Sequence, residues 1–330
     1  MATDLRTRII GTGCYIAENV LTNDDLSKIV DTSDEWIVER TGIRERRVAA
    51  DDIATSDMGT AALKNALDMA ELRPNDLDMI ICGTVTPDYP LPATAPTIQH
   101  KLGITNMCAA FDLSAACAGF LYALSVADSM IKQGQVRNVG VIGAEVLTRA
   151  VDFEDRTTCV LFGDGAGAVV VTGDSSGRGL LSSHLYSDGS LLEALRIPSG
   201  GSVAPITVEA IERRQQYIKM NGREVFKYAV RYLADSSQKA FEANGITAED
   251  ISRVVPHQAN MRILDAVSKR INIPLSKFEL NLDRFGNTSS ASVPIALDEA
   301  VRGGRVKDGD LLLMIALGAG ISWGSALVKW

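Results

Sequence analysis

The sequence predicts an α/β protein that contains two copies of one structural unit. Short apolar runs typical of buried strands alternate with longer segments of helical periodicity along the 330 residues, a pattern typical of sheets covered by helices. Three segments of the first half also match three segments of the second half in the same order, which indicates a duplication. The most loop-like stretch, 173–179, predicts a boundary near residue 175 and two units, 1–175 and 176–330.

The individual elements follow from hydrophobic periodicity. An apolar segment at 9–13 predicts the first strand. Apolar runs bounded by turn residues predict further strands at 79–82, 109–113, 139–143, 168–172, 253–256 and 311–316. Apolar positions at the spacing of a helical face predict helices at 54–72, 119–133, 223–243 and 262–272.

The repeat relates specific positions of the two halves. Residues 76–84 match 250–258, residues 117–124 match 290–297, and residues 139–143 match 312–316, all at an offset of about 173 residues. His257 is thereby placed at a strand end equivalent to that of Gly83, whereas Cys117 and Asn287 are placed at the starts of equivalent helices. Such strand ends and helix starts converge in a two-fold arrangement of open α/β sheets, so we expect these residues to meet.

Composition argues against several classes of function. The net charge of -8 disfavours a nucleic-acid partner, which needs clustered positive charge, although a local basic patch can still bind an acidic protein. No apolar run reaches the roughly 18 residues of a membrane span, and the first residues lack the features of a secretory signal. Five cysteines at irregular spacing argue against disulfides and a cysteine metal site. We therefore expect a cytoplasmic protein without membrane association.

Cys117 is the first candidate for chemistry, because it stands among small residues where a strand ends and a helix begins. A helix N-terminus favours the thiolate form of a cysteine without a metal. The alternative is a structural cysteine, since free cysteines are commonly buried. His257 follows a strand, and the alternative for it is a polar residue that simply satisfies its own hydrogen bonds. Asn287 precedes a helix, and the alternative for it is a simple turn. Asn260 is expected to cap the helix that follows it.

Two glycine-rich segments allow unusual backbone geometry. In 317–325, which follows a strand, the backbone N–H groups are candidates for an oxyanion hole, and the alternative is a hairpin turn. The segment 163–167 has the glycines of a phosphate loop but lacks its Lys-Ser/Thr pair. Its glycines are instead expected to let a strand and a helix pack closely.

Taken together, these segments resemble the β-ketoacyl-[acyl-carrier-protein] synthase III family of the thiolase superfamily, essentially from end to end. The most specific motifs are His-Gln-Ala-Asn at 257–260 and Gly-Asn-Thr-Ser at 286–289, combined with the segment around Cys117. The other matching segments are 32–44, 155–156, 162–167, 220–226 and 322–327. The resemblance implies a duplicated thiolase-like fold with five layers, α/β/α/β/α, and a homodimer.

The resemblance also implies an acyltransferase with a triad of Cys117, His257 and Asn287, in which Asn287 is typical of the initiating type. An acyl-CoA primer would acylate Cys117 and then condense, with loss of CO2, with malonyl-[acyl-carrier protein] to initiate fatty acid biosynthesis. The backbone N–H groups of Cys117 and Ala319 would form the oxyanion hole. CoA thioesters are substrates in this family, and neither a cofactor nor a metal is implied.

Binding residues are implied by the same resemblance. Those expected to contact CoA are Thr32, Trp36, Arg156, Gly222, Phe226 and Asn260. Those expected to bind the acidic acyl-carrier protein are Lys227, Arg262, Lys269 and Arg270. For the basic residues the alternative is a solvated helix face. Trp36 and Arg156 would stack on the two sides of the CoA adenine.

Two positions depart from the family pattern. Ala319 stands in a turn where relatives often have three successive glycines, so its methyl group is expected to restrict the backbone. Leu91 stands where many members carry a Phe that closes the acyl pocket from the partner subunit, so we expect room for primers longer or more branched than acetyl. The alternatives to fatty acid initiation are a related acyltransferase of specialised metabolism and a non-catalytic acyl-binding protein, which would not need the complete triad.

Overall fold

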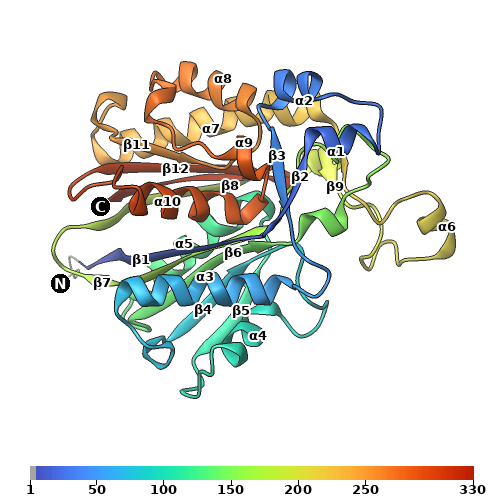
Figure 1. The fold of residues 1–330 in the computed structure, drawn as a ribbon. Coiled ribbons are helices and arrows are strands. Elements are labelled where there is room, and N and C mark those ends of the chain that lie inside the picture. Colours follow the sequence, from blue (N-terminus) through green and yellow to red (C-terminus); the bar gives the residue numbers. More distant parts are fainter. Residues whose placement is uncertain (1–4) are drawn as a thin grey trace.

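The computed structural model describes residues 5–330 and arranges them in five layers (Figure 1). Two sheets alternate with three layers of helices, in the order α/β/α/β/α. The first sheet has the strand order β1-β7-β6-β4-β5. Its strands are β1 (Arg6–Ile16), β4 (Met79–Gly83), β5 (Ala109–Leu113), β6 (Asn138–Glu145) and β7 (Gly165–Asp174). β4 runs parallel to β5 and β6, whereas β7 is antiparallel to β6 and β1.

The second sheet repeats this arrangement. Read from its β8 edge, the order is β8-β13-β12-β11, with β8 (Gly179–Ser187), β11 (Arg253–Pro256), β12 (Leu311–Gly318) and β13 (Ser322–Lys329). β11 runs parallel to β12, and β13 is antiparallel to β12 and β8. A single parallel bridge between Val254 and Phe278 stands where the first sheet has β5. The matching order supports the division into units 1–175 and 176–330, whose boundary stays a prediction.

Three pairs of long helices make up the helical layers (Figure 1). α5 (Gly119–Lys132) and α10 (Ser292–Arg302) lie between the sheets, and both contact strands of each. α3 (Thr55–Ala70) and α4 (Thr94–Lys101) cover the first sheet, whereas α7 (Gly222–Asn244) and α8 (Met261–Ile271) cover the second. The apolar face of α5 gives the central core Phe120 and Leu121, which are fully buried opposite Leu297 of α10 and the inner faces of both sheets.

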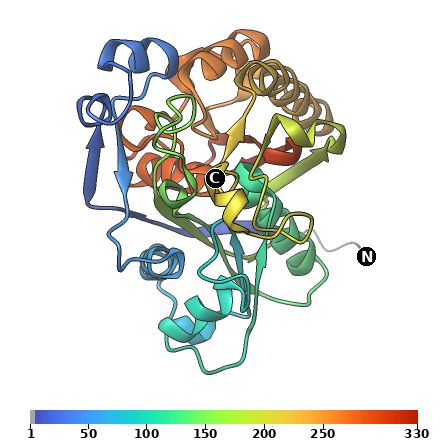
Figure 2. The same ribbon diagram turned by 90° about the vertical axis from the view of Figure 1, so that its right-hand side faces the viewer.

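Shorter elements surround these layers. β2 (Asn19–Thr22) pairs with β3 (Glu45–Val48), and α1 (Asn23–Ser27) and α2 (Asp34–Thr41) lie between them in the chain. β9 (Leu195–Arg196) pairs with β10 (Lys219–Met220), and the connection between them carries α6 (Val208–Glu212), which protrudes from the body (Figure 1) and faces the viewer in Figure 2. The remaining helix is α9 (Leu282–Phe285). Short 3₁₀ turns are η1 (Pro74–Asp76), η2 (Ala116–Ala118), η3 (Leu147–Ala150), η4 (Gly189–Ala194), η5 (Ala248–Asp250), η6 (Leu275–Lys277), η7 (Ser289–Ala291) and η8 (Ala319–Ile321).

The predicted strands and helices are all present, with bounds that shift by a few residues. The sequence did not predict β8 and β13, because polar side chains interrupt their apolar pattern. Gly167 of β7 lies against Pro294 and Ile295 of α10, where a Cβ would collide with the helix backbone. The close strand–helix packing expected for 163–167 is therefore confirmed. Within residues 5–330, no helix combines the length and apolar character that a bilayer crossing requires.

Candidate active site

Cys117 lies where the first sheet meets the middle layer. The chain leaves β5, passes through η2 and enters α5 at Gly119. Ala116 adopts a left-handed backbone with a φ of 47°, which turns the chain so that Cys117 stands at the start of the helix. Gly318 of β12 packs against this turn, and a Cβ there would collide with the amide nitrogen of Cys117. The glycine therefore permits the close approach of the second sheet to the cysteine.

Burial determines the protonation state of the thiol. Cys117 is 6% exposed, and burial raises its pKa to about 12, with the charge of Glu145 acting in the same direction and a hydrogen bond with Ser289 opposing it. The side chain is consequently a neutral thiol at neutral pH, and its proton must leave when the sulfur attacks. The N-terminus of α5 provides partial positive charge that stabilises the thiolate as it forms.

His257 follows β11, at the strand end that the repeat assigns to it. Its backbone N–H donates to the carbonyl of Ile315 (2.7 Å), and its Nδ1 lies 2.7 Å from the hydroxyl of Ser292 at the start of α10. The ring is 3% exposed, and burial lowers its pKa to about 4. The imidazole is therefore neutral at neutral pH, and Ser292 holds its orientation.

Asn287 is fixed by its backbone and by its own side-chain oxygen. Its N–H donates to the Leu161 carbonyl (2.8 Å), and its carbonyl accepts from the N–H of Gly163 (3.0 Å). Oδ1 accepts a hydrogen bond of 2.8 Å from the N–H of Ser289. This contact sets the orientation of the amide, because it leaves Nδ2 as the group that can donate to a ligand.

Cys117, His257 and Asn287 meet at one inner cavity of about 120 Å³. The thiol comes from the start of α5, the imidazole from the end of β11, and the amide from the segment that leads into α10. A nucleophile beside a neutral imidazole and an amide donor can carry out acyl transfer and stabilise a developing oxyanion. The convergence of strand ends and helix starts expected from the repeat is what brings these side chains together.

Two family models match two separate parts of the chain. The model described as 3-oxoacyl-[acyl-carrier-protein] synthase III matches residues 111–189, and the model of the C-terminal part of the same synthase matches residues 241–330. A β-ketoacyl-[acyl-carrier-protein] synthase III of Caldanaerobacter subterraneus subsp. tengcongensis is 51% identical over 330 residues, covering 100% of this chain and 99% of the relative. The chain belongs to the synthase III family.

Solved structures of a synthase III and of a priming β-ketosynthase have the same fold. The enzyme of Aquifex aeolicus VF5 has a TM-score of 0.91 and 50% sequence identity, covering 98% of this chain and 100% of that chain. The priming β-ketosynthase of the R1128 polyketide biosynthetic pathway has a TM-score of 0.90 and 37% identity, covering 98% of this chain and 96% of that chain. The resemblance and the five-layer thiolase-like fold predicted from the sequence are confirmed.

The inner cavity adjoins a wider outer cleft of about 680 Å³, and Leu161, Met220, Gly222 and Asn260 line both spaces. Five of the six residues expected to contact CoA line one or both of these spaces: Trp36 and Arg156 in the outer cleft, Phe226 in the inner cavity, and Gly222 and Asn260 in both. Asn260 also caps α8, as predicted, because its Oδ1 accepts from the N–H of Arg262 (2.8 Å). The roles of these residues in a synthase III reaction stay predictions.

Trp36 lies against two arginines at the mouth of the outer cleft. The guanidinium of Arg156 is 5.1 Å from its ring centroid and that of Arg40 is 4.5 Å away. An aromatic base between Trp36 and Arg156 needs about 7 Å, two contact distances of ~3.5 Å, so Arg156 would have to move. Arg40 was not predicted, because nothing in its sequence context separates it from other surface arginines. The remaining expected CoA contact, Thr32, has a buried Oγ1 with no partner among the described residues.

The four residues expected to bind the carrier protein are exposed on α7 and α8. Lys269 pairs with Asp265 (2.6 Å), and Arg270 lies 3.6 Å from Asp235. Within the described part of the chain, neither Lys227 nor Arg262 forms an ion pair with a carboxylate. The solvated helix face therefore remains a good alternative for Lys269 and Arg270, whereas Arg262 lies next to Asn260 at the cleft.

Cys117 also lines a second space, a side pocket of about 210 Å³. Its wall is mainly apolar and includes Val85, Leu147, Phe162, Ile197 and Ile218, together with Ser289 and Ala319. Leu91 is 87% exposed and is not among the described residues that line this pocket. A role for Leu91 in the pocket would therefore need the partner subunit, as the resemblance implies.

Ala319 lies in η8, directly after Gly318. The left-handed backbone of this turn falls on Gly320 (φ 69°) and Ile321 (φ 40°) rather than on Ala319. The methyl group of Ala319 therefore causes no backbone strain. The sequence predicted that this methyl group would restrict the turn, but Ala319 stands at a position whose backbone accepts any side chain. Its place beside Cys117 on the side pocket is compatible with the expected oxyanion hole.

Glu145 at the end of β6 is a site residue that the sequence did not reveal, because it simply follows a buried strand. The carboxylate is fully buried and accepts from the hydroxyls of Thr86 (2.7 Å), Ser290 (2.9 Å) and Thr84 (3.2 Å) and from the N–H of Val85 (3.1 Å). Burial raises its pKa. Glu145 thus connects the strand-end loop of the first half to the start of α10 in the second.

Proposed function

We propose that this synthase III condenses an acyl-CoA primer with malonyl-[acyl-carrier protein], giving 3-oxoacyl-[acyl-carrier protein], CO2 and free CoA. The observation that carries the proposal is that Cys117 lines two spaces. One is the inner cavity, which adjoins the outer cleft, and the other is the apolar side pocket. A thioester entering through the cleft can deliver its acyl group to the sulfur with the acyl chain directed into the side pocket.

The first half-reaction is transfer of the primer to Cys117. The sulfur attacks the thioester carbonyl, the C–S bond to CoA breaks, and the proton lost by the Cys117 thiol is taken up by the released CoA thiolate. The backbone N–H groups of Cys117 and Ala319 hold the tetrahedral oxyanion in this proposal. Placement of the thiol at the start of α5 lowers the cost of charging a side chain whose pKa is about 12.

The second half-reaction is condensation with the malonyl group. Loss of CO2 leaves an enolate, whose oxygen accepts hydrogen bonds from Nε2 of His257 and Nδ2 of Asn287. The Ser292 hydroxyl donates to the Ser289 carbonyl (2.7 Å), and it would have to turn its proton to Nδ1 of His257 (2.7 Å) to keep the ring proton on Nε2. The hydrogen bond from the N–H of Ser289 leaves Nδ2 of Asn287 available. The carbanion attacks the acyl carbon on Cys117, the C–S bond breaks, and the departing thiolate of Cys117 takes up a proton from solvent to regenerate the thiol. No cofactor or metal enters this scheme.

The partners follow from the same chemistry. CoA thioesters bind along Trp36 and Arg156, and the acyl-carrier protein docks on the basic residues beside the cleft, since opposite charge speeds association even with an acidic protein. The enzyme acts as a homodimer in the cytoplasm. Exposed apolar side chains near α6, at Val203, Val208 and Ile211, support a second subunit on this face, and five free cysteines suit a reducing compartment.

Incubation with acetyl-CoA followed by mass spectrometry tests whether the protein is an enzyme. An acyl adduct on Cys117 is expected, and Cys117→Ala should not form it. A non-catalytic acyl-binding protein would bind the thioester without forming any adduct. Such a result would remove the basis of the proposal.

A primer panel with malonyl-[acyl-carrier protein] then tests the reaction and its specificity. The 3-oxoacyl product is expected with primers longer or more branched than acetyl, because the side pocket measures about 210 Å³ and a leucine at position 91 of a second subunit would close it less than the Phe of many relatives. Strict preference for acetyl would contradict this expectation. The relative from a polyketide pathway keeps specialised metabolism as a second candidate, and acylation without condensation on the malonyl carrier protein would favour it.

A further inference from the structure

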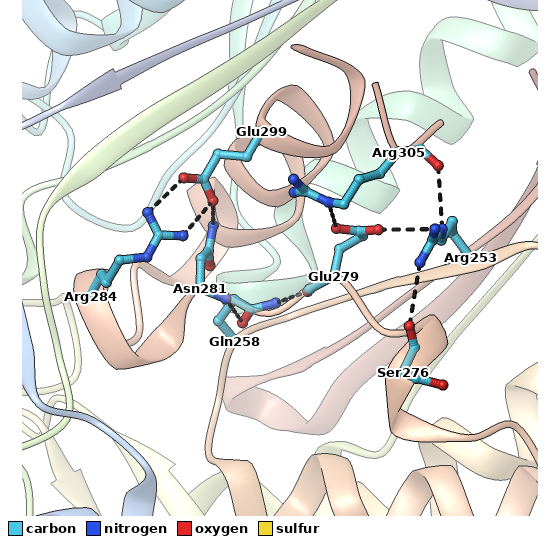
Figure 3. A network of polar contacts seen from close by, with 8 residues as sticks. All are labelled: Arg253, Gln258, Ser276, Glu279, Asn281, Arg284, Glu299 and Arg305. Atoms are coloured by element: carbon cyan, nitrogen blue, oxygen red, sulfur yellow. Dashed lines mark hydrogen bonds and ion pairs between the residues drawn. The ribbon is translucent and has the colours of Figure 1, made fainter. Parts of the chain in front are cut away.

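Gln258 follows His257 and is buried inside a network of polar contacts (Figure 3). The side chain is 1% exposed. Its Nε2 donates to the carbonyls of Pro256 (2.9 Å) and Glu279 (3.0 Å), and its Oε1 accepts from the N–H of Asn281 (3.1 Å). Both amide protons and the oxygen of Gln258 are therefore used, and all three partners are backbone groups.

These contacts join the two segments that carry His257 and Asn287. Pro256 ends β11 and immediately precedes His257, whereas Asn281 begins the stretch that runs through α9 to Asn287. The side-chain amide of Gln258 binds only backbone groups. It therefore fixes the distance between two chain segments and does not act by orienting a neighbouring side chain. Gln258 itself lines neither cavity among the described residues.

The same network continues to α10. Nδ2 of Asn281 donates to Glu299 (2.8 Å), and Arg284 of α9 donates to both carboxylate oxygens of Glu299 (2.9 and 3.1 Å) (Figure 3). Glu299 lies on α10, whose first residue, Ser292, contacts the His257 ring. These hydrogen bonds, together with α10 itself, thus connect β11 through Asn281 and Glu299 to Ser292 and back to the imidazole.

We propose that Gln258 is a positioning residue that sets the spacing between His257 and Asn287 for the condensation half-reaction. The inference rests on the proposed function, in which these two side chains donate to one enolate oxygen. Two donors assist only if they converge on one point, and a displacement of about 1 Å can cost roughly 100-fold in rate. Acyl transfer depends on Cys117 of η2 and Ala319 of η8, so the spacing should affect it little.

The test measures the two half-reactions separately in the full-length protein with Gln258→Met, which keeps the length of the side chain and removes its hydrogen bonds. Acylation of Cys117 by acetyl-CoA is followed by mass spectrometry, and condensation by 3-oxoacyl product from malonyl-[acyl-carrier protein]. We expect condensation to fall at least 10-fold, with acylation within about 2-fold of wild type. The loss should appear in kcat, because Gln258 does not contact the substrate.

Arg305→Met is the matched control. Arg305 binds the Glu279 carboxylate (2.7 Å), so its loss disturbs the same segment from the side away from Gln258 (Figure 3). This variant should lower the thermal midpoint while both half-reactions keep their wild-type ratio. An equal loss of both half-reactions in Gln258→Met, or no loss in either, would overturn the positioning role.

Gln258→Glu keeps the test decisive if Gln258→Met does not fold. The glutamate retains an acceptor for Asn281 but places an oxygen against two carbonyls unless it is protonated. Condensation should therefore be reduced at pH 8 and recover in part as the pH falls, relative to wild type at each pH. An unchanged ratio of the half-reactions in this variant would also overturn the inference. If wild-type protein is acylated but never condenses, the proposed function fails instead, and the two failures are distinct.

Discussion

The starts of α5 and α10 use the same backbone for different chemistry. Each helix follows a 3₁₀ turn whose first residue is left-handed without being glycine, Ala116 at 47° and Ser289 at 49°. The next residue is Cys117 in the first half and Ser290 in the second. The Ser290 hydroxyl is shared between the Gly83 carbonyl (2.8 Å) and the Glu145 carboxylate (2.9 Å). The duplicated framework therefore supplies one nucleophile, and its second copy supports it.

The neighbouring strand ends differ in the same way. Gly83 ends β4 against Gly119, where a Cβ would collide with the helix backbone. The equivalent positions in the second half are His257 and Ser292, which form a hydrogen bond of 2.7 Å. In the first half, two glycines let the strand end and the helix start pack directly against each other. In the second half, an imidazole and a hydroxyl stand at the same two positions. The difference shows how a repeat can place a nucleophile and its electrostatic partners on opposite sides of one cavity.

Asn287→Asp is the strongest way to separate the two halves. The change puts a negative charge where the enolate forms and leaves Cys117 untouched. Condensation is expected to fall by about 10²–10³-fold, the range seen when one oxyanion donor is lost, with acyl transfer retained. Single-turnover acylation and product formation measure the two steps. Equal losses in both would show that Asn287 serves Cys117 directly and would break the proposed division of labour.

The buried imidazole of the second half should make the protein sensitive to acid. The pKa of His257 is lowered to about 4 in the folded state from an ordinary 6.5, so between those values the unfolded chain binds a proton that the folded chain does not. Stability is therefore complete above pH 6.5 and is lost as the pH falls toward 4, by about 3 kcal/mol in all. Urea unfolding of His257→Gln across this range should lack that loss.

His100→Gln is the control for this measurement, because His100 is exposed on α4. This variant should keep the wild-type loss of unfolding free energy between pH 6.5 and 4. If His257→Gln shows the same acid dependence as wild type, burial of the imidazole does not account for it.

Glu145→Gln tests the carboxylate that connects the two helix starts. The charge of Glu145 raises the pKa of Cys117, so its removal should lower that pKa and increase the thiolate fraction. Alkylation of Cys117 by iodoacetamide at pH 8, followed by peptide mass spectrometry, should accelerate by about 2–10-fold, since a lower pKa gains more thiolate than it loses nucleophilicity. Asp164→Asn, which removes another buried carboxylate, should leave the rate unchanged. An unchanged rate in Glu145→Gln would contradict the predicted coupling.

The sequence predicted the repeat, and through it the meeting of Cys117 with His257 and Asn287, because hydrophobic periodicity and glycines are visible in one dimension. The sequence did not reveal the roles of Glu145, Ser292 and Gln258. Each of them acts through partners far away in the chain, such as Ser290 for Glu145. Polar residues of this kind look like ordinary residues beside strands and helices. Their partners become visible only when the two halves are placed against each other.

The smallest expected effect addresses the left-handed residues that open the two helices. Ala→Gly at position 116 removes a Cβ from a backbone that costs a non-glycine residue roughly 1–2 kcal/mol, but the glycine makes the unfolded chain more flexible by roughly 0.4–1 kcal/mol. The net change should stabilise the protein by roughly 0–1.6 kcal/mol. At position 289 the matching comparison is between the variants Ser289→Ala and Ser289→Gly. Both lack the hydroxyl, so the difference between their stabilities gives the effect of removing the methyl group alone.

Equivalent backbones predict equal effects at the two positions. The free energies of unfolding from urea titration should change by amounts that agree within about 0.5 kcal/mol, the usual limit of additivity for independent sites. A clear stabilisation at one position and a destabilisation at the other would mean that the two turns, despite φ values of 47° and 49°, carry different strain. The two helix starts would then be equivalent in backbone shape but not in energy. The strain at Ala116 would be specific to the turn that carries Cys117 and would not be a general property of the repeated unit.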